Sequence, residues 1–242
     1  MQRVTIPAIV AGLFLTLAPA HADIVVDYVV DAGGNNSDPL NGLAARATYT
    51  LSGDQLSILL ENTSTGVPVG FDTSDSLLVS LGINLPGVQF ATGDAADIGP
   101  GSIGIGTWAT RGPGESVGEE WLWTNDFGGD LLEVYAQVIS TSQGQGGGLT
   151  TRFDGGSGTV GGPFGGIAAD PVLRSIPGSQ HAVSDSIRFE LTLSAPLTEA
   201  ELRPAALASI VEYGSDQRYL RVPEPASIAL VGIGVAALRR RR

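Results

Sequence analysis

Ile187-Arg-Phe-Glu-Leu-Thr-Leu-Ser194 alternates apolar and polar side chains without a break, and this period of two indicates a β-strand. In a strand, Ile187, Phe189, Leu191 and Leu193 all point to one face. That face would pack on a core, while the residues between them face water. A helix would instead repeat its apolar residues every three or four positions. The segment therefore predicts a half-buried strand.

A second alternating region predicts a hairpin. Ala47, Tyr49 and Leu51 alternate with polar residues, Ser52-Gly-Asp-Gln55 supplies turn-forming residues, and the alternation resumes from Leu56. Further strands are predicted over residues 24–30, 76–85, 119–124, 131–139 and 206–213. Many short strands separated by turns are typical of a mainly β fold, here a single antiparallel β-sandwich or jelly-roll-like domain.

The remaining segments are expected to be mostly loop. Two glycine-dense stretches, residues 93–118 and 144–178, predict long surface loops, because glycine raises the entropic cost of ordering the backbone. One helical turn is expected over Thr198–Leu202, ending before Pro204.

The amino terminus has the three parts of a secretory signal peptide. Arg3 is followed by the apolar run 4–17, and small residues stand at Ala20 and Ala22. We therefore expect a signal helix over residues 1–22, export through the Sec translocon, and cleavage by signal peptidase before Asp23.

The carboxyl terminus also has three parts. Val222-Pro-Glu-Pro225 is held extended by its two prolines, Pro223 and Pro225, which flank Glu224. The 13 residues from Ala226 to Leu238 carry no charge. As a helix they would reach about 20 Å, against about 30 Å of hydrocarbon, so they predict a short transmembrane helix. The chain then closes with Arg239, Arg240, Arg241 and Arg242, which favour the cytoplasmic side.

This ending resembles the PEP-CTERM sorting signal of Gram-negative bacteria, whose pattern is Pro-Glu-Pro, an apolar stretch and a basic end. The resemblance covers under a tenth of the chain. It implies a transient stay in the inner membrane and cleavage near Glu224 by an exosortase, a membrane protease. It further implies transfer to the cell surface or release, in a family often associated with exopolysaccharide and biofilm.

Composition excludes several classes of function. Without Arg3 and the four terminal arginines, eight of the 13 arginines remain against 25 acidic residues, a net charge of −17. Such a body repels phosphate backbones, so we expect no nucleic-acid partner. The chain has no lysine and no cysteine, which removes Schiff-base chemistry, P-loops, thiolate nucleophiles, disulfides and cysteine-based zinc sites.

Only one histidine, His181, remains after removal of the signal peptide. A Ser-His-Asp relay would need a strained nucleophilic serine, and no Gly-x-Ser-x-Gly elbow lies in the strand-turn-helix context that such a serine needs. We therefore expect His181 to be a loop or strand-entry residue, and the protein to be no enzyme and to hold no cofactor.

Glu119-Glu120-Trp121-Leu-Trp123 is the segment best suited to carbohydrate, since indoles stack on sugar faces and paired carboxylates hydrolyse glycosides. In a strand, Trp121 and Trp123 would share one face, so the alternative is that both indoles fill the core. The sequence leaves both interpretations open.

Two loops offer oxygen ligands for a weak calcium site, although no ligand set for a metal is predicted. Asp31 to Asp38, with Asn35 and Ser37, is one, and Asp72-Thr-Ser-Asp75 is the other. The same residue types also form ordinary turns.

The sequence thus predicts a signal peptide (1–22), an exported β domain (23–221) and a sorting and anchor segment (222–242). The function predicted is that of a non-catalytic cell-surface or extracellular-matrix protein. The alternative is a carbohydrate-binding or polysaccharide-active protein that uses the region of Trp121 and Trp123.

Overall fold

The computed structural model describes residues 23–34, 39–127, 134–142, 149–158, 160, 162–173, 175–214 and 218–224. The expected signal helix with Ala20 and Ala22, and the segment from Pro225 to Arg242, lie outside these residues. Among the residues described, no helix is both long and apolar enough to cross a membrane.

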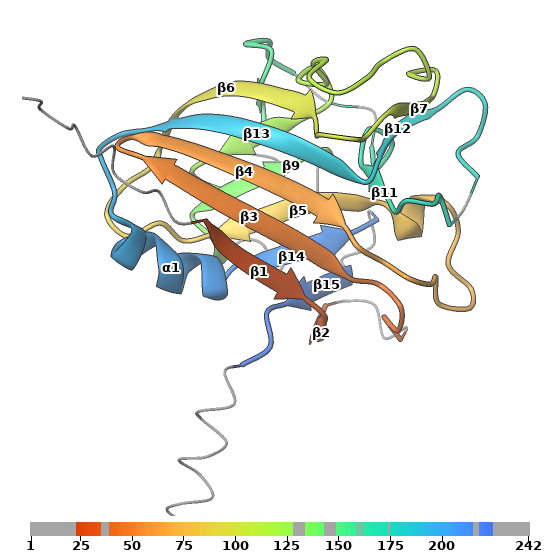
Figure 1. The fold of residues 1–242 in the computed structure, drawn as a ribbon, viewed down its shortest axis with the longest axis horizontal. Coiled ribbons are helices and arrows are strands. Elements are labelled where there is room, and N and C mark those ends of the chain that lie inside the picture. The colour runs from red at the N-terminus through yellow and green to blue at the C-terminus, as the bar shows by residue number, and fades with distance from the viewer. Residues whose placement is uncertain are drawn as a thin grey trace, which may run out of the picture.

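The first sheet has five antiparallel strands in the order β1-β3-β4-β13-β6 (Figure 1). Their bounds are β1 Ile24–Tyr28, β3 Ala45–Ser52, β4 Gln55–Asn62, β6 Phe90–Ile98 and β13 Ser186–Leu193. The alternating segment over residues 187–194 forms most of β13, where Phe189 lies opposite Ile58 on one side and Ala96 on the other. The predicted hairpin is β3–β4, closed at the pair Ser52 and Gln55.

The second sheet has ten strands and forms the other layer. One path through it is β10-β8-β9-β5-β11-β12-β7, and β14, β15 and β2 join it through β5. The bounds are β2 Val30–Gly33, β5 Leu78–Ile83, β7 Gly104–Gly106, β8 Leu122–Thr124, β9 Gln137–Ser140, β10 Thr151–Arg152, β11 Ile167–Ala168, β12 His181–Ser184, β14 Ile210–Tyr213 and β15 Arg218–Arg221. A 3₁₀ turn, η1 Ser74–Ser76, precedes β5.

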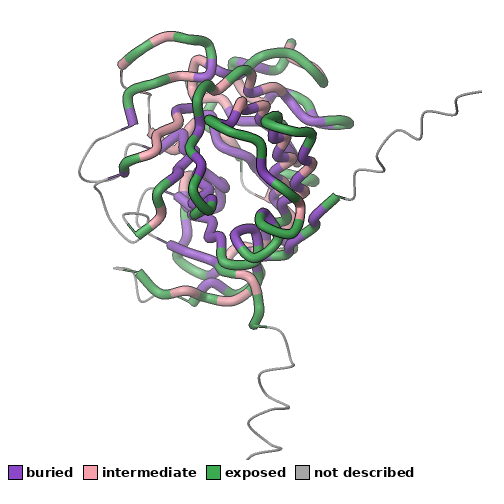
Figure 2. The backbone as a smooth tube through the Cα atoms, turned by 90° about the vertical axis from the view of Figure 1, so that its left-hand side faces the viewer, coloured by how far each residue is buried: buried purple, intermediate pink, exposed green. Residues whose placement is uncertain are grey.

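The two sheets face one another across a shared core. Its buried side chains come from both layers, including Leu56 and Phe189 of the first sheet and Leu81 and Val211 of the second. Figure 2 shows buried segments through the interior and exposed ones around it. All six residues of β5 are buried, because smaller clusters cover the outer face of its sheet as well. The prediction of a mainly β fold with antiparallel sheets is confirmed, except that β11 and β12 pair in parallel.

The glycine-dense segments contain more strand than predicted. Residues 93–118 hold most of β6 and all of β7, and residues 144–178 hold β10 and β11. The error at β6 has a physical reason. Gly93 is small because the Trp123 indole lies directly over it, and a Cβ atom there would come within 2.4 Å of Nε1. A glycine can therefore mark close packing inside a sheet as well as a loop.

The helix is longer than predicted. α1 runs from Glu199 to Leu207, through Pro204, and β14 begins only at Ile210, so the strand expected from residue 206 was placed too early. A capping box between Thr198 and Glu201 closes its first turn. Burial of Leu202, Ala205 and Ala206 then outweighs the one hydrogen bond that proline cannot donate.

Three strands begin later than expected: β5 at Leu78 rather than at residue 76, β8 at Leu122 rather than at residue 119, and β9 at Gln137 rather than at residue 131. The strand β15 was not predicted. With an arginine at each end, Arg218-Tyr-Leu-Arg221 lacks the alternation of apolar and polar residues that predicts a strand. In the structure this strand lies between β14 and β2.

Candidate functional site

The segment after β15 leaves the folded body without a linker. The backbone of Arg221 is held on two sides, since it pairs with Ile210 of β14 and with Val30 of β2. Its carbonyl also accepts a hydrogen bond from the amide of Val29, at 3.2 Å. Val222 then packs on the main core, and Pro223 and Glu224 are exposed. Only Val222 therefore separates the Pro-Glu pair from an ordered strand.

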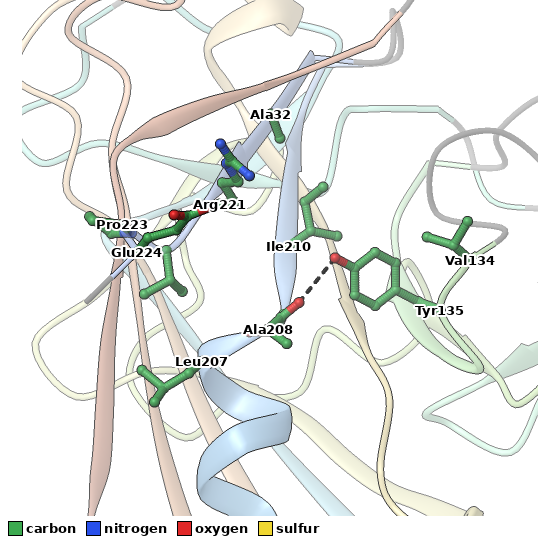
Figure 3. Close-up of a pocket in the computed structure, with 11 residues that line it drawn as sticks. Ala32, Val134, Tyr135, Leu207, Ala208, Ile210, Arg221, Pro223 and Glu224 are labelled. Carbon is green, nitrogen blue, oxygen red and sulfur yellow. Dashed lines mark hydrogen bonds between the residues drawn. The ribbon is translucent and has the colours of Figure 1, made fainter. Parts of the chain in front are cut away.

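A pocket of about 360 Å³ lies beside this exit (Figure 3). Residues from β2, the end of α1, the start of β14 and the segment before β9 form it together with the exit segment itself. They are Ala32, Val134, Tyr135, Leu207, Ala208, Ser209, Ile210, Arg221, Val222, Pro223 and Glu224. Figure 3 shows Pro223 and Glu224 along one side of the pocket and Val134 and Tyr135 on the other.

Hydrogen bonds hold the walls of the pocket. The Tyr135 hydroxyl donates to the carbonyl of Ala208, at 3.0 Å. Behind the wall, the Ser209 hydroxyl lies 2.6 Å from the hydroxyl of Tyr28, which lies 2.9 Å from that of Tyr49. The Ser209 hydroxyl also donates to the Ala206 carbonyl at the end of α1. The junction of α1 with β14 is therefore tied to the first sheet.

Burial shapes the protonation of these phenols. Burial is the main cause that raises the pKa of Tyr135, and the nearby positive charge of Arg221 lowers it in part. Burial likewise raises the pKa of Tyr49 to about 12, against the opposing effect of its hydrogen bonds with Ser209 and Tyr28. The groups around the pocket are thus neutral hydroxyls at ordinary pH, and the charges closest to it are those of Arg221 and Glu224.

Residues 221–242 match the family model of the PEP-CTERM protein-sorting motif. The chain carries a PEP-CTERM protein-sorting motif. The match starts at the last residue of β15, so the motif and the folded body share Arg221. A motif of this kind implies an exosortase as the processing partner and transit through a membrane to the cell surface. The search of curated proteins found no match, and neither did the search of solved structures.

Of the residues assigned to the sorting motif, the structure places Pro223 and Glu224, both on the surface beside the pocket. Pro225 and the four terminal arginines lie outside the described residues. The proline-bracketed acid, the uncharged run and the terminal arginines of the tail indicated the motif, but no signal in the sequence indicated that a pocket adjoins it.

The four residues proposed for carbohydrate do not form an open platform. Trp121 is 0% exposed, packs edge-on against Phe189 and donates its indole N–H to the Gly165 carbonyl at 3.1 Å. Trp123 is half-buried and packs against the same core as Trp121. Trp121 therefore has no face open to a sugar, and the core interpretation is confirmed for that side chain.

Glu119 and Glu120 instead belong to a cluster around Trp108, a residue that sequence reasoning did not single out. The Trp108 indole stacks on His181 at 4.0 Å, and the Arg111 guanidinium lies 4.5 Å from the Trp108 ring centroid. Glu119 forms an ion pair with Arg111 at 2.5 Å, and Glu120 Oε1 lies 3.7 Å from His181 Nε2. His181 is the first residue of β12, which agrees with the expectation of a strand-entry residue and not with that of a loop residue. Glu119 therefore pairs with Arg111, and Glu120 faces His181.

In both candidate calcium loops, described carboxylates take part in hydrogen bonds or ion pairs within the protein. In the first, the Asp31 carboxylate accepts a hydrogen bond from the amide of Gly33 at 2.7 Å, and residues 35–38 lie outside the described part. In the second, Asp72 accepts from Ser74, whose hydroxyl holds the Asp72 pKa below its usual value. Asp75 forms a buried ion pair with Arg218.

Within the ranges that the structure describes, no three acidic or histidine side chains come together to hold a metal. Asn35, Ser37 and Asp38 lie outside these ranges.

Proposed function

We propose that this chain is an exported, non-catalytic protein of the cell surface or extracellular matrix, in which residues 23–221 form a β-sandwich module. The Sec translocon exports it and signal peptidase cuts after Ala22. The segment 226–238 then holds it in the inner membrane, with Arg239 to Arg242 in the cytoplasm. An exosortase cuts close to Glu224 and releases the module or passes it to the surface.

The match of residues 221–242 to the sorting motif carries this proposal. The position of Pro223 and Glu224 supports it, because a protease can reach an exposed, extended segment. The body lacks disulfides and relies on its apolar core instead, in keeping with a chain that has no cysteine. A role in exopolysaccharide or biofilm formation is part of this proposal, because proteins with this sorting motif often occur alongside exopolysaccharide production. The proposed role requires no cofactor.

The test replaces both prolines of the motif in the full chain, as Pro223→Ala with Pro225→Ala, in a host that has the processing protease. We expect the variant to stay uncut in the membrane fraction, because the extended segment is no longer rigid. Mass spectrometry of the mature protein would read both ends and any group attached to them.

The matched control is Pro113→Ala with Pro177→Ala, two exposed prolines far from the motif in the sequence. The control should be cut like the parent. Cleavage and release of the motif variant at the parental rate would show that the protease does not read these prolines.

A further inference from the structure

We infer that the pocket beside Pro223 is a second contact surface for the protease that removes the sorting motif, and that it receives one or two apolar side chains from the protease's extracytoplasmic face. This inference rests on the proposed function. The protease would then contact the folded body as well as the sorting motif.

The first reason is continuity. Val222, Pro223 and Glu224 line the pocket themselves, so any molecule that binds around the Pro-Glu pair lies at its mouth (Figure 3). Val222 packs on the core and Arg221 is fixed between β14 and β2, so the start of the motif is held beside the pocket.

The second reason is the chemistry of the rim. Val134 is 63% exposed and Leu207 is 43% exposed, and both line this one pocket. The one phenol in the wall, Tyr135, already donates to Ala208. A partner would therefore gain most by burying apolar surface there.

The third reason is size and rigidity. About 360 Å³ is at the low end of the range of about 300–1,000 Å³ for pockets that hold a whole small ligand. It suits a side chain or two. The hydroxyl network of Ser209, Tyr28 and Tyr49 fixes the wall before any partner arrives, which lowers the entropic cost of binding.

Charge favours a protein over a lipid surface as the occupant. Residues 23–224 carry 25 acidic residues against eight arginines, so anionic headgroups repel this part of the chain. Of the charged groups, Arg221 and Glu224 are the two that line the pocket. A pair of opposite charges beside an apolar pocket gives a protein partner both orientation and contact area.

The experiment compares two double variants of the full chain in a host with the processing protease. The rim variant is Val134→Ser with Leu207→Ser. The control is Val69→Ser with Ile103→Ser, whose side chains are 100% and 56% exposed and do not line the pocket. Pulse-chase labelling measures the rate at which the sorting segment is removed, and circular dichroism with thermal melting verifies that both variants fold.

We expect the rim variant to be processed on the order of tenfold more slowly than the parent, and the control at the parental rate. If the parent and the control are processed and the rim variant is equally fast, the inference is wrong and the proposed function stands. If the parent itself is never processed, the proposed function is wrong, and the inference that rests on it is wrong as well.

Two other occupants give different results, and each would overturn the inference. Flotation of the released protein with vesicles of phosphatidylethanolamine and phosphatidylglycerol, lost in the rim variant while processing is unchanged, would identify a lipid contact. A dimer seen by sedimentation of the released protein, lost in the rim variant with processing unchanged, would identify a second copy.

Discussion

At the scale of single residues, Tyr49 shows how burial changes a chemical property that sequence alone does not reveal. Its alternating position predicted that it faces the core, and it is 0% exposed. Its hydroxyl lies 2.9 Å from that of Tyr28 and 3.2 Å from that of Ser209, far along the chain. Burial raises the Tyr49 pKa from 10.0 to about 12.

This pKa predicts a loss of stability at high pH. Above pH 10 the unfolded chain gives up the phenolic proton while the folded chain keeps it until about pH 12. The free energy of unfolding therefore falls across this window, and the contribution of Tyr49 is complete only below it. One pH unit inside the window corresponds to about 1.4 kcal/mol.

Tyr49→Phe tests this by urea unfolding at pH 7 and pH 11. At pH 7 the variant should lose about 1 kcal/mol, because its hydroxyl no longer bonds to Tyr28 and Ser209. By pH 11 the gap between variant and parent should close, because the variant has no proton to lose at this position. A constant gap at both pH values would contradict the raised pKa.

The single residues of the sorting motif could be predicted because their chemistry is local: two prolines fix φ and four arginines carry charge wherever the chain folds. The cluster of Trp108, Arg111 and His181 could not. Its members come from β12 and from the loop after β7, and only the paired strands β7 and β12 bring them together.

At the scale of elements, β6 is a strand that alternation of apolar and polar residues in the sequence does not predict. Phe90 to Ile98 forms nine residues of strand beside β13, although the segment contains Gly93 and several small or acidic residues. Alternation predicted β13, β3 and β4, because each has one buried and one wet face. β6 has no such pattern along its whole length, since only Phe90, Ala96 and Ile98 of its nine residues are buried and it lies at the edge of the sheet.

The close approach of Trp123 to β6 predicts that Gly93 cannot be enlarged. In Gly93→Ala, the new Cβ would lie 2.4 Å from the indole Nε1 and 2.9 Å from a ring carbon of Phe153. Both rings would have to move, at a cost of about 1–3 kcal/mol in the free energy of unfolding. Urea unfolding measures this loss, and Trp fluorescence should report the displaced indole.

The matched control is Gly178→Ala, where a Cβ would meet no atom within 4 Å. This variant should stay within about 0.5 kcal/mol of the parent. If both alanines have the same small effect, the contact between β6 and Trp123 is not close in solution.

At the scale of the whole molecule, both predicted processing sites lie directly against the ordered body. Asp23, the first residue after the expected signal cleavage, bonds to Thr50 and precedes β1 by one position. Arg221 ends β15 where the sorting motif begins. The body therefore has no spacer that would keep it away from the machinery acting on the carboxyl terminus.

This arrangement predicts the effect of adding a spacer. Insertion of ten Gly and Ser residues between Arg221 and Val222 would place the motif about 18 Å from β15 on average, and so away from the pocket. The motif itself would be intact, so the chain should still be cut, but more slowly and at the rate of the rim variant. Combining the insertion with Val134→Ser and Leu207→Ser should then slow cleavage no further, because each change removes the same contact. If the two changes slow cleavage additively, the spacer and the rim act through different contacts. If the chain with the spacer is cut at the parental rate, the exosortase recognises the tail alone.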